Sequence, residues 1–217
     1  LIKAIDQSVD RYLRIVDGNS EPEKPRVLLC AFTGMASFNI GGTTMHSAFS
    51  LPVRSGDMQE LSTQRVSEMR KTFSKLRLVI IDEISLVGAT LFGWVHRRLK
   101  QILGQDEPFG GVSMLLLGDF NQLQPVQDTW IFNERPVDDN NRYASLLSTH
   151  DNVNPLWSQF SIFRLTQIMR QAGDRTFAEC LSCLGKYGLL GLSDTQLGML
   201  NSRIVSAESI PAEIVYL

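Results

Sequence analysis

The sequence predicts an α/β fold in which helices flank a parallel β-sheet. Three short runs are almost entirely apolar, which is typical of strands buried on both faces: 26–32, 76–82 and 112–119. Helix-like stretches at 62–76 and 89–103 separate these runs. Because two parallel strands must be joined by a long crossover, this alternation favours a parallel sheet. The apolar run at 161–166 is a candidate fourth strand.

Other segments lie outside the sheet. Residues 1–15 place apolar side chains on one face of a helix, and the polar, turn-rich residues 18–25 indicate a loop. Residues 127–155 are rich in Asp, Asn and Pro and have no clear period. We interpret them as an excursion from the sheet or a small inserted element.

Helices are also expected near the end of the chain, at 174–187 and at 193–205, where Ser193 or Asp194 is the N-cap. These helices predict the opening of a second domain. The expected organisation is a first domain over 1–126, an irregular insertion over 127–157 and the start of a second domain over 158–217.

Bulk composition restricts the class of protein. The 217 residues are 43% hydrophobic and 20% charged, which is ordinary for a globular protein, and no stretch holds the roughly 18 apolar residues of a membrane-spanning helix. A net charge of −2 disfavours a histone-like DNA binder but allows a local cationic groove. Three cysteines indicate a reducing compartment rather than a disulfide scaffold. The chain starts at Leu1 in what resembles a helix already under way, so we expect a longer protein and no signal peptide.

Polar residues follow each predicted strand at its carboxyl end. Thr33-Gly34 follows the first run, Asp82-Glu83 the second, and Gly118-Asp119 the third. In open α/β sheets, ligands bind at this edge of the sheet. The sequence therefore predicts a nucleotide or phosphate site there.

The pair Asp82-Glu83 closes the run LVIIDE, which has the form of a Walker B strand. An aspartate at such a strand end is placed to hold Mg²⁺ beside nucleotide phosphates, and the next glutamate to position or deprotonate a water molecule. The alternative is a solvated turn, because Asp-Glu pairs are common.

Two other positions have weaker local support. Asp119 and Gln122 lie on the turn after the third run, where an amide can contact a terminal phosphate, although Gly-Asp is also a usual turn pair. Arg170 follows the candidate fourth strand and can act as an arginine finger that neutralises charge on a transferred phosphate. The alternative for Arg170 is an ordinary surface arginine.

Residues 31–49 combine a strand end with glycines and hydroxyl side chains. Backbone amides together with Thr33, Thr43 and Thr44 suit contact with a phosphodiester backbone, which gives binding without sequence preference. The alternative is a glycine-rich connection that binds no ligand. His46 taken alone is more typical of a structural hydrogen bond than of a ligand contact.

Taken together and in order, these motifs resemble the superfamily-one DNA helicases of the petite-integration-frequency type, and especially the helicase domains that Helitron transposons encode. A-x-T-G with FNIGGTTMHSAFSLP is similar to motifs Ia and Ib, IIDEISL to motif II, GDFNQLQPV to motif III and LTQIMRQ to motif IV. PFGG at 108–111 resembles the signature region of this family. The resemblance covers nearly the whole chain.

The resemblance implies a RecA-like P-loop NTPase sheet, truncated at both ends, that uses ATP and Mg²⁺. Asp82 would hold the metal through water, Glu83 would be the base, Gln122 would sense the terminal phosphate, and Arg170 would stabilise the transition state. Asp119 would join them in binding the nucleotide. The DNA path would be lined by Thr33, Gly34, Asn39, Thr44 and His46.

The resemblance also implies a cellular role. The activity would be five-prime to three-prime movement on single-stranded DNA and unwinding of forked duplex DNA by a monomeric motor, in the nucleus or mitochondrion and away from membranes. DNA repair, recombination, telomere maintenance and rolling-circle transposition are the processes expected. Residues 127–155 would be a wedge that parts the duplex.

Several departures from the family pattern support a second hypothesis. Phe32 and Met35 stand where the family has proline and a basic residue, and Gln124 replaces the first of two prolines in motif III. The pattern G-x-x-x-x-G-K-[ST] does not occur in the 217 residues, and we expect it upstream of Leu1, with motifs V and VI beyond Leu217. The alternative is a decayed, transposon-derived remnant that binds DNA or protein without catalysis. A P-loop ATPase that remodels something other than DNA is a third reading.

Overall fold

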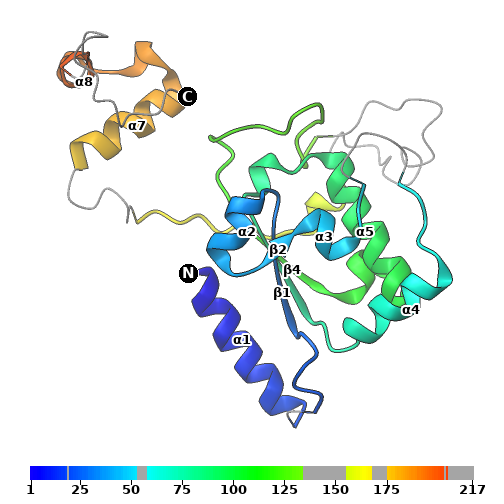
Figure 1. Cartoon of the computed structure of the whole chain (residues 1–217). Helices are drawn as coiled ribbons and strands as arrows, with labels where there is room; N and C mark the ends of the chain where they lie inside the picture. The colour runs from blue at the N-terminus through cyan, green and yellow to red at the C-terminus, as the bar shows by residue number, and fades with distance from the viewer. Residues whose placement is uncertain (19, 53–57, 134–154, 168–174, 203, 205–217) are drawn as a thin grey trace, which may run out of the picture. The chain divides into compact units, whose positions relative to one another are not determined.

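The computed structural model describes residues 1–18, 20–52, 58–133, 155–167, 175–202 and 204. The chain separates into two compact units, Leu1–Ser161 and Ile162–Leu217, and each is described by itself (Figure 1). The predicted domain boundaries at 126 and 157 stay a prediction. None of the described helices has the length and apolar content needed to cross a membrane.

A four-stranded parallel sheet forms the centre of the first unit. Its strands are β1 (Val27–Ala31), β2 (Thr43–Thr44), β3 (Leu78–Asp82) and β4 (Ser113–Leu116), in the order β2-β1-β3-β4. Every neighbouring pair is parallel, and Ala31 lies opposite Asp82 in the β1–β3 ladder. The predicted parallel sheet and its three apolar strands are therefore confirmed.

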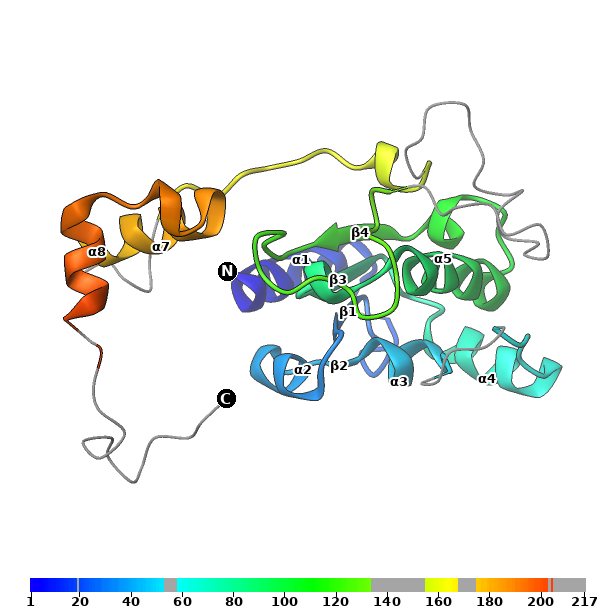
Figure 2. The same cartoon turned by 90° about the horizontal axis from the view of Figure 1, so that it is seen from above.

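Helices cover both faces of this sheet (Figure 2). On one face lie α1 (Ile2–Val16) and α2 (Gly34–Ile40), and on the other α3 (Met45–Phe49), α4 (Thr63–Thr72) and α5 (Ala89–Leu103). Alternation along the strands separates two cores, because successive side chains of a strand point to opposite faces. Cys30, Val79 and Ile81 belong to the larger core beneath α3, α4 and α5, whereas Ala31 packs with Ala36 and Ile40 of α2.

Two fully buried arginines fix the connections around the sheet. Arg26 pairs with Asp17 at 3.1 Å and donates to the carbonyls of Ser20, Glu21 and Lys24, which closes the loop between α1 and β1. Arg98 of α5 donates to the Ser50 carbonyl at 3.3 Å and the Gln59 carbonyl at 3.0 Å. Buried charges need such partners, because a buried ion without them costs several kcal/mol, on the order of a domain's whole stability.

The PFGG motif forms the short 3-10 turn η2 (Pro108–Gly111). Phe109, Gly110 and Gly111 all have positive φ values, and a Cβ on Gly110 would lie 2.8 Å from the Leu99 carbonyl oxygen. The turn aims the Phe109 ring at Phe92 and His96, with ring centroids 5.3 and 5.2 Å apart. The motif is therefore explained by packing against α5.

The apolar run at 161–166 is not a strand. Residues 161–167 have no regular secondary structure, and Ile162, Phe163 and Leu165 are exposed. A strand in a parallel sheet requires burial between neighbours, and these side chains lack it among the described residues. Just before this run, η3 (Trp157–Gln159) and Phe160 pack on the larger core through stacked and tilted rings.

The second unit contains α7 (Arg175–Tyr187), the 3-10 turn η4 (Leu189–Gly191) and α8 (Asp194–Asn201). Ser193 is the N-cap of α8 and forms a capping box with Gln196, so the cap is the first of the two predicted candidates, Ser193 and Asp194. The helix ends at Asn201, short of the predicted 205. That this unit opens a second RecA-like domain stays a prediction.

Candidate active site at the carboxyl ends of the strands

The candidate site begins where β1 and β3 end side by side. Asp82 is the last residue of β3, and Glu83 follows it directly. Because Ala31 is in register with Asp82, the residues just after β1 reach the same edge as Glu83. Thr33 Oγ1 donates a hydrogen bond to Glu83 Oε2 at 3.1 Å. The tertiary structure thus joins a side chain that we expected on the DNA path to the expected catalytic base.

The backbone turns sharply at Glu83. Its φ of 54° and ψ of 44° lie in the left-handed region, which is uncommon for a residue other than glycine. The Glu83 amide donates to Asp82 Oδ1 at 2.9 Å, and the 3-10 turn η1 (Ile84–Leu86) starts at the next residue. Such backbone strain costs about 1–3 kcal/mol and concentrates at functional sites. Here it holds two adjacent carboxylates at the strand end.

The turn after β4 lies directly against this segment. The Ile84 amide donates to the Leu117 carbonyl at 2.9 Å, and the Leu117 amide donates to the Ile81 carbonyl at 2.8 Å. These two hydrogen bonds therefore extend the backbone pairing of β3 and β4 beyond the carboxyl ends of the two strands. The motif that carries Asp119 and Gln122 is anchored next to Glu83 by this contact.

Within that turn, Asp119 has a local structural role. Its Oδ1 accepts from the backbone amide and the side-chain amide of Asn121, both at 2.9 Å. The Gln122 amide donates to the Asp119 carbonyl at 3.0 Å, and the Gln122 side chain is exposed. Asp119 thus stabilises the turn that carries the exposed Gln122 side chain. Nucleotide contact by either residue stays a prediction.

The charge of the site suits a bound cation. Asp82 and Glu83 are half-buried, and within the described part of the chain no lysine or arginine forms an ion pair with either one. The described residues also include no cluster of three or more His, Cys, Asp or Glu side chains that could enclose a metal. Mg²⁺ beside a nucleotide needs only one or two carboxylates, because water and phosphate oxygens complete its coordination. The residues present therefore fit Mg²⁺ bound with a nucleotide.

The residues expected on the DNA path lie on α2 and α3. Gly34 and Asn39 are exposed on α2, and Thr44 caps α3 by accepting from the Ser47 amide at 3.3 Å. The His46 ring lies edge-on to the Phe32 ring, with centroids 6.0 Å apart, and burial lowers the pKa of His46. A lowered pKa favours the neutral imidazole, which can hydrogen-bond or stack. DNA contact by these residues stays a prediction.

The fourth residue of the expected active site, Arg170, lies outside the described residues. The structure brings Asp82 and Glu83 to one edge of the sheet with the turn that carries Gln122. The approach of Arg170 to that edge stays a prediction.

Asp128 is a supporting residue that the sequence patterns did not reveal. Its Oδ2 accepts from the Thr90 amide at 3.0 Å and its Oδ1 from the Thr90 hydroxyl at 2.8 Å. Gly88, the N-cap of α5, has no side chain for this purpose, so Asp128 satisfies the start of that helix from 38 residues away. Sequence patterns for helix capping involve residues within a few positions of the helix start, so they do not identify Asp128.

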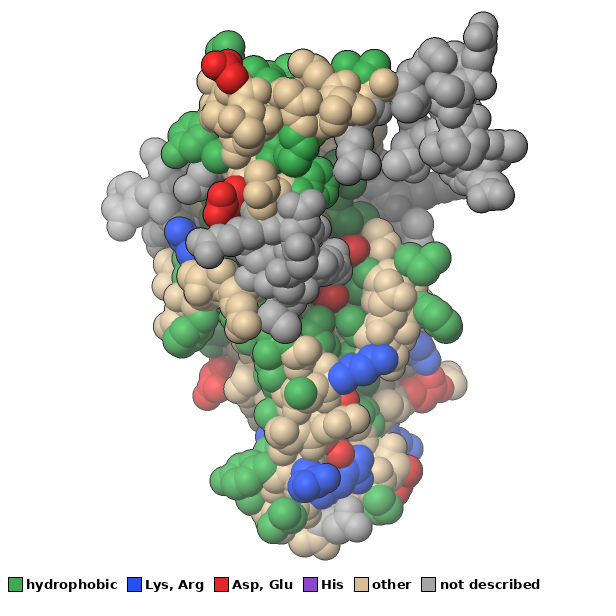
Figure 3. Space-filling model, turned by 90° about the vertical axis from the view of Figure 1, so that its left-hand side faces the viewer, with side chains coloured by type: hydrophobic (Ala, Val, Ile, Leu, Met, Phe, Trp, Pro, Cys, Tyr) green, Lys and Arg blue, Asp and Glu red, His purple; other side chains and the backbone are tan. Residues whose placement is uncertain are grey.

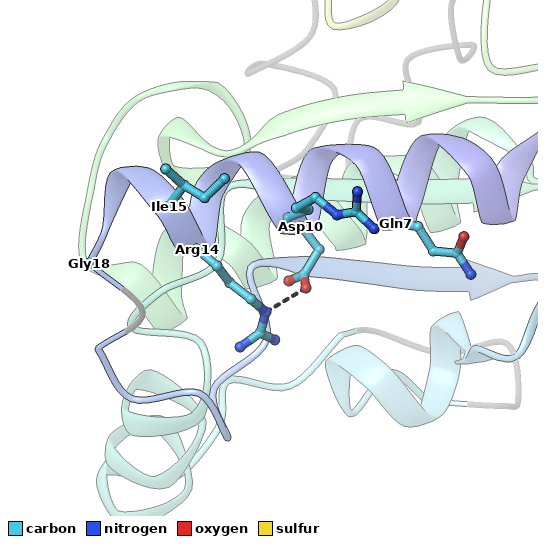
Figure 4. Close-up of a pocket in the computed structure, with 6 residues that line it drawn as sticks. Gln7, Asp10, Arg14, Ile15 and Gly18 are labelled. Atoms are coloured by element: carbon cyan, nitrogen blue, oxygen red, sulfur yellow. Dashed lines mark hydrogen bonds and ion pairs between the residues drawn. The ribbon is translucent and has the colours of Figure 1, made fainter.

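A shallow hollow elsewhere on the first unit lies along α1 (Figure 4). Its lining comes from the middle and end of that helix and the turn after it: Gln7, Asp10, Arg11, Arg14, Ile15 and Gly18. Arg14 forms an ion pair with Asp10, and this carboxylate weakens the attraction of Arg14 for an anionic ligand. The end of α1 leads through residues 17–26 to the start of β1, so the hollow lies away from the carboxyl ends of the strands.

Comparison with known proteins agrees with this arrangement. The sequence profile of the PIF1-like helicase family matches residues 13–182. The ATP-dependent DNA helicase PIF1 of Candida albicans is 31% identical over 163 residues, which are 73% of this chain and 17% of that protein.

Two solved structures are similar to the chain. The crystal structure of the Pif1 helicase from Candida albicans covers 98% of this chain with a TM-score of 0.61 and 26% identity. The Pif1 helicase from Bacteroides in complex with ADP-AlF3 and single-stranded DNA covers 86% with a TM-score of 0.58 and 28% identity. The chain spans 43% and 42% of those two proteins. With a family profile that matches most of its length and the strand-end carboxylates in place, this chain belongs to the PIF1-like helicase family.

Proposed function

We propose that these residues form part of an ATP-driven motor that moves along single-stranded DNA from five-prime to three-prime and unwinds duplex DNA. The observation that carries the proposal is the pair of carboxylates, Asp82 and Glu83, held without a cationic partner among the described residues, beside the turn that ends in Gln122. The similar Bacteroides helicase was crystallised with ADP-AlF3 and single-stranded DNA, which supports ATP and DNA as ligands here.

The two carboxylates have different roles in this proposal. Asp82 would hold Mg²⁺, which would neutralise charge on the phosphates. Glu83 accepts a proton from the water molecule that attacks the terminal phosphorus. Its Oε2 accepts from Thr33, and we assign the water to Oε1. The exposed Gln122 amide contacts the terminal phosphate and responds to its release, and Arg170 stabilises charge on the transferred group.

The DNA side is assigned to Thr33, Gly34, Asn39, Thr44 and His46. Their hydroxyl, amide and ring groups suit contacts that do not depend on sequence. Lysine and arginine side chains on the face seen in Figure 3 stand in small groups with acidic side chains beside them. In this proposal DNA binding rests on hydrogen bonds from the assigned residues, in keeping with a net charge of −2.

The wider role follows the same family. We assign the activity to forked DNA in repair, recombination, telomere maintenance or rolling-circle transposition, by a monomeric motor in the nucleus or mitochondrion. The insertion 127–157 is assigned to strand separation.

The test uses the longest protein that contains this chain. ATP hydrolysis is measured with and without single-stranded DNA, and strand displacement is measured on a forked duplex. We expect DNA-stimulated turnover that Glu83→Gln reduces by about 10²–10⁴ with little change in nucleotide affinity. Glu68→Gln is the matched control, because Glu68 is an exposed carboxylate of α4 that pairs with Arg65.

The outcomes separate the alternatives. Oligonucleotide binding without any turnover supports the non-catalytic remnant. Turnover that is indifferent to DNA supports an ATPase that acts on something else. Equal turnover by Glu83→Gln and the unaltered protein refutes the assigned base.

A further inference from the structure

One hydroxyl group connects the two sides of the candidate site. Thr33 Oγ1 donates to Glu83 Oε2 and accepts from the Ala36 amide, both at 3.1 Å. The second bond makes Thr33 the N-cap of α2. A carboxylate at the end of β3 is thereby linked to the first turn of the helix that carries the exposed Gly34 and Asn39.

The position of this hydroxyl is tightly determined. A threonine hydroxyl has one proton to donate, and that proton is used on Glu83 while a lone pair is used on Ala36. Because threonine is branched at Cβ, its χ1 rotation is also restricted. Rotation of Thr33 would break both bonds, so the hydroxyl holds Glu83 Oε2 at a defined place relative to α2.

The Glu83 side chain has few other restraints. Among the described residues no cation pairs with its carboxylate, and its own amide is occupied by Asp82 Oδ1. Among the described residues, the hydrogen bond that orients the carboxylate is the one from Thr33. A glutamate side chain without such a contact rotates freely, and loss of orientation slows catalysis even when the reacting group is intact.

We infer that Thr33 is a positioning residue for Glu83: it holds Oε2 so that Oε1 faces the attacking water, and it transmits movement of α2 to the base. This inference rests on the proposed function, in which α2 contacts DNA and Glu83 accepts the proton. It departs from the expectation that Thr33 only lines the DNA path. DNA that shifts α2 changes the orientation of Glu83 directly.

Three substitutions separate positioning from helix capping. Thr33→Val removes both hydrogen bonds with little change in shape. Thr33→Gly has no hydroxyl for Glu83 and adds no charge, and glycine is well tolerated at an N-cap, so it is expected to fold even if Thr33→Val does not. Thr33→Ser keeps both bonds. Ser62→Ala is the control for capping alone, because Ser62 caps α4 by accepting from the Arg65 amide and lies on an exposed helix start.

The measurement is steady-state ATP hydrolysis at saturating single-stranded DNA by the longest protein that contains this chain. We expect Thr33→Val and Thr33→Gly to lower kcat by about tenfold to a hundredfold, while KM for ATP changes by less than about threefold. Thr33→Ser and Ser62→Ala should retain kcat within about twofold. A purely structural role of Thr33 would instead leave Thr33→Gly as active as the unaltered protein.

The failures of the two proposals are distinguishable. If the unaltered protein does not hydrolyse ATP, the proposed function fails and the positioning role fails with it. If the unaltered protein is active and Thr33→Gly matches its kcat, only the positioning role is refuted. A rise in KM at unchanged kcat also refutes it, because that result would place Thr33 in nucleotide binding.

Discussion

Gly118 and Ile84 approach so closely that a Cβ atom placed on Gly118 would lie 2.9 Å from the Ile84 amide nitrogen. The same Ile84 amide donates to the Leu117 carbonyl at 2.9 Å. The close approach is therefore between two backbone segments, the one that follows Glu83 and the one that leads into Asp119. It requires glycine because neither segment can move without breaking that hydrogen bond.

The first prediction concerns this contact. Gly118→Ala should lower the free energy of unfolding by about 1–3 kcal/mol, because the added methyl group meets backbone rather than a flexible side chain. Gly93→Ala is the matched control: Gly93 lies inside α5 with nothing within 4 Å of its added Cβ, so helix propensity should make that change neutral or stabilising. Urea unfolding of both variants measures the two changes in unfolding free energy, which we expect to differ in sign. Equal effects would show that the contact at Gly118 is not tight.

The second prediction concerns the start of α5. Asp128→Ala removes the acceptor of the Thr90 amide and hydroxyl, and should destabilise the chain by about 1–2 kcal/mol. Thr90→Val keeps the backbone bond and should cost less. The shift in urea midpoint measures both, and a larger loss in Thr90→Val than in Asp128→Ala would contradict the assignment of Asp128 as the cap.

The third prediction concerns pH. The pKa of His96 is lowered to about 4, chiefly by burial and further by Lys100, while Asp106 opposes the shift. Between about 4 and 6.5 the unfolded chain therefore binds a proton that the folded chain does not, so stability is full above pH 6.5 and declines as the pH falls. Because His96 is only partly buried, we expect a loss of about 1–2 kcal/mol rather than the full linkage value.

His96→Asn isolates this contribution. Asparagine offers an acceptor for the Phe109 amide, which donates to His96 Nδ1 at 3.1 Å, but it does not titrate. The difference in unfolding free energy between the unaltered chain and this variant should change between pH 7 and pH 4. The pKa of His46 is lowered too, and that contribution is common to both proteins and cancels in the difference. A difference that is constant with pH would contradict the prediction.

The fourth prediction concerns the 217 residues purified alone. They contain no G-x-x-x-x-G-K-[ST] pattern, whose lysine and backbone amides bind the nucleotide phosphates in P-loop enzymes. We therefore expect no DNA-stimulated ATP hydrolysis above background from this polypeptide. A phosphate-release assay with and without single-stranded DNA checks this, and the longest protein that contains the chain is the positive control.

Much of the fold could be read from local patterns. Apolar runs predicted β1, β3 and β4, and helical periodicity predicted α1, α4, α5 and α7 within a few residues. The helices α2 and α3 and the two-residue strand β2 were missed, because elements this short carry no period. Their ends are set by the caps Thr33 and Thr44 and by contacts with the sheet. The run at 161–166 has strand composition but no neighbour to pair with among the described residues.

The amino-acid sequence by itself determined which residues stand at the strand ends, since burial on both faces leaves only the carboxyl edge for Asp82, Glu83 and Asp119. Only the tertiary structure decided which side chains meet there. The bonds from Thr33 to Glu83 and from Thr90 to Asp128 join residues 50 and 38 positions apart. The first of these bonds depends on the register of β1 and β3, and the second on the return of the chain to the start of α5 after β4; neither is encoded in local spacing.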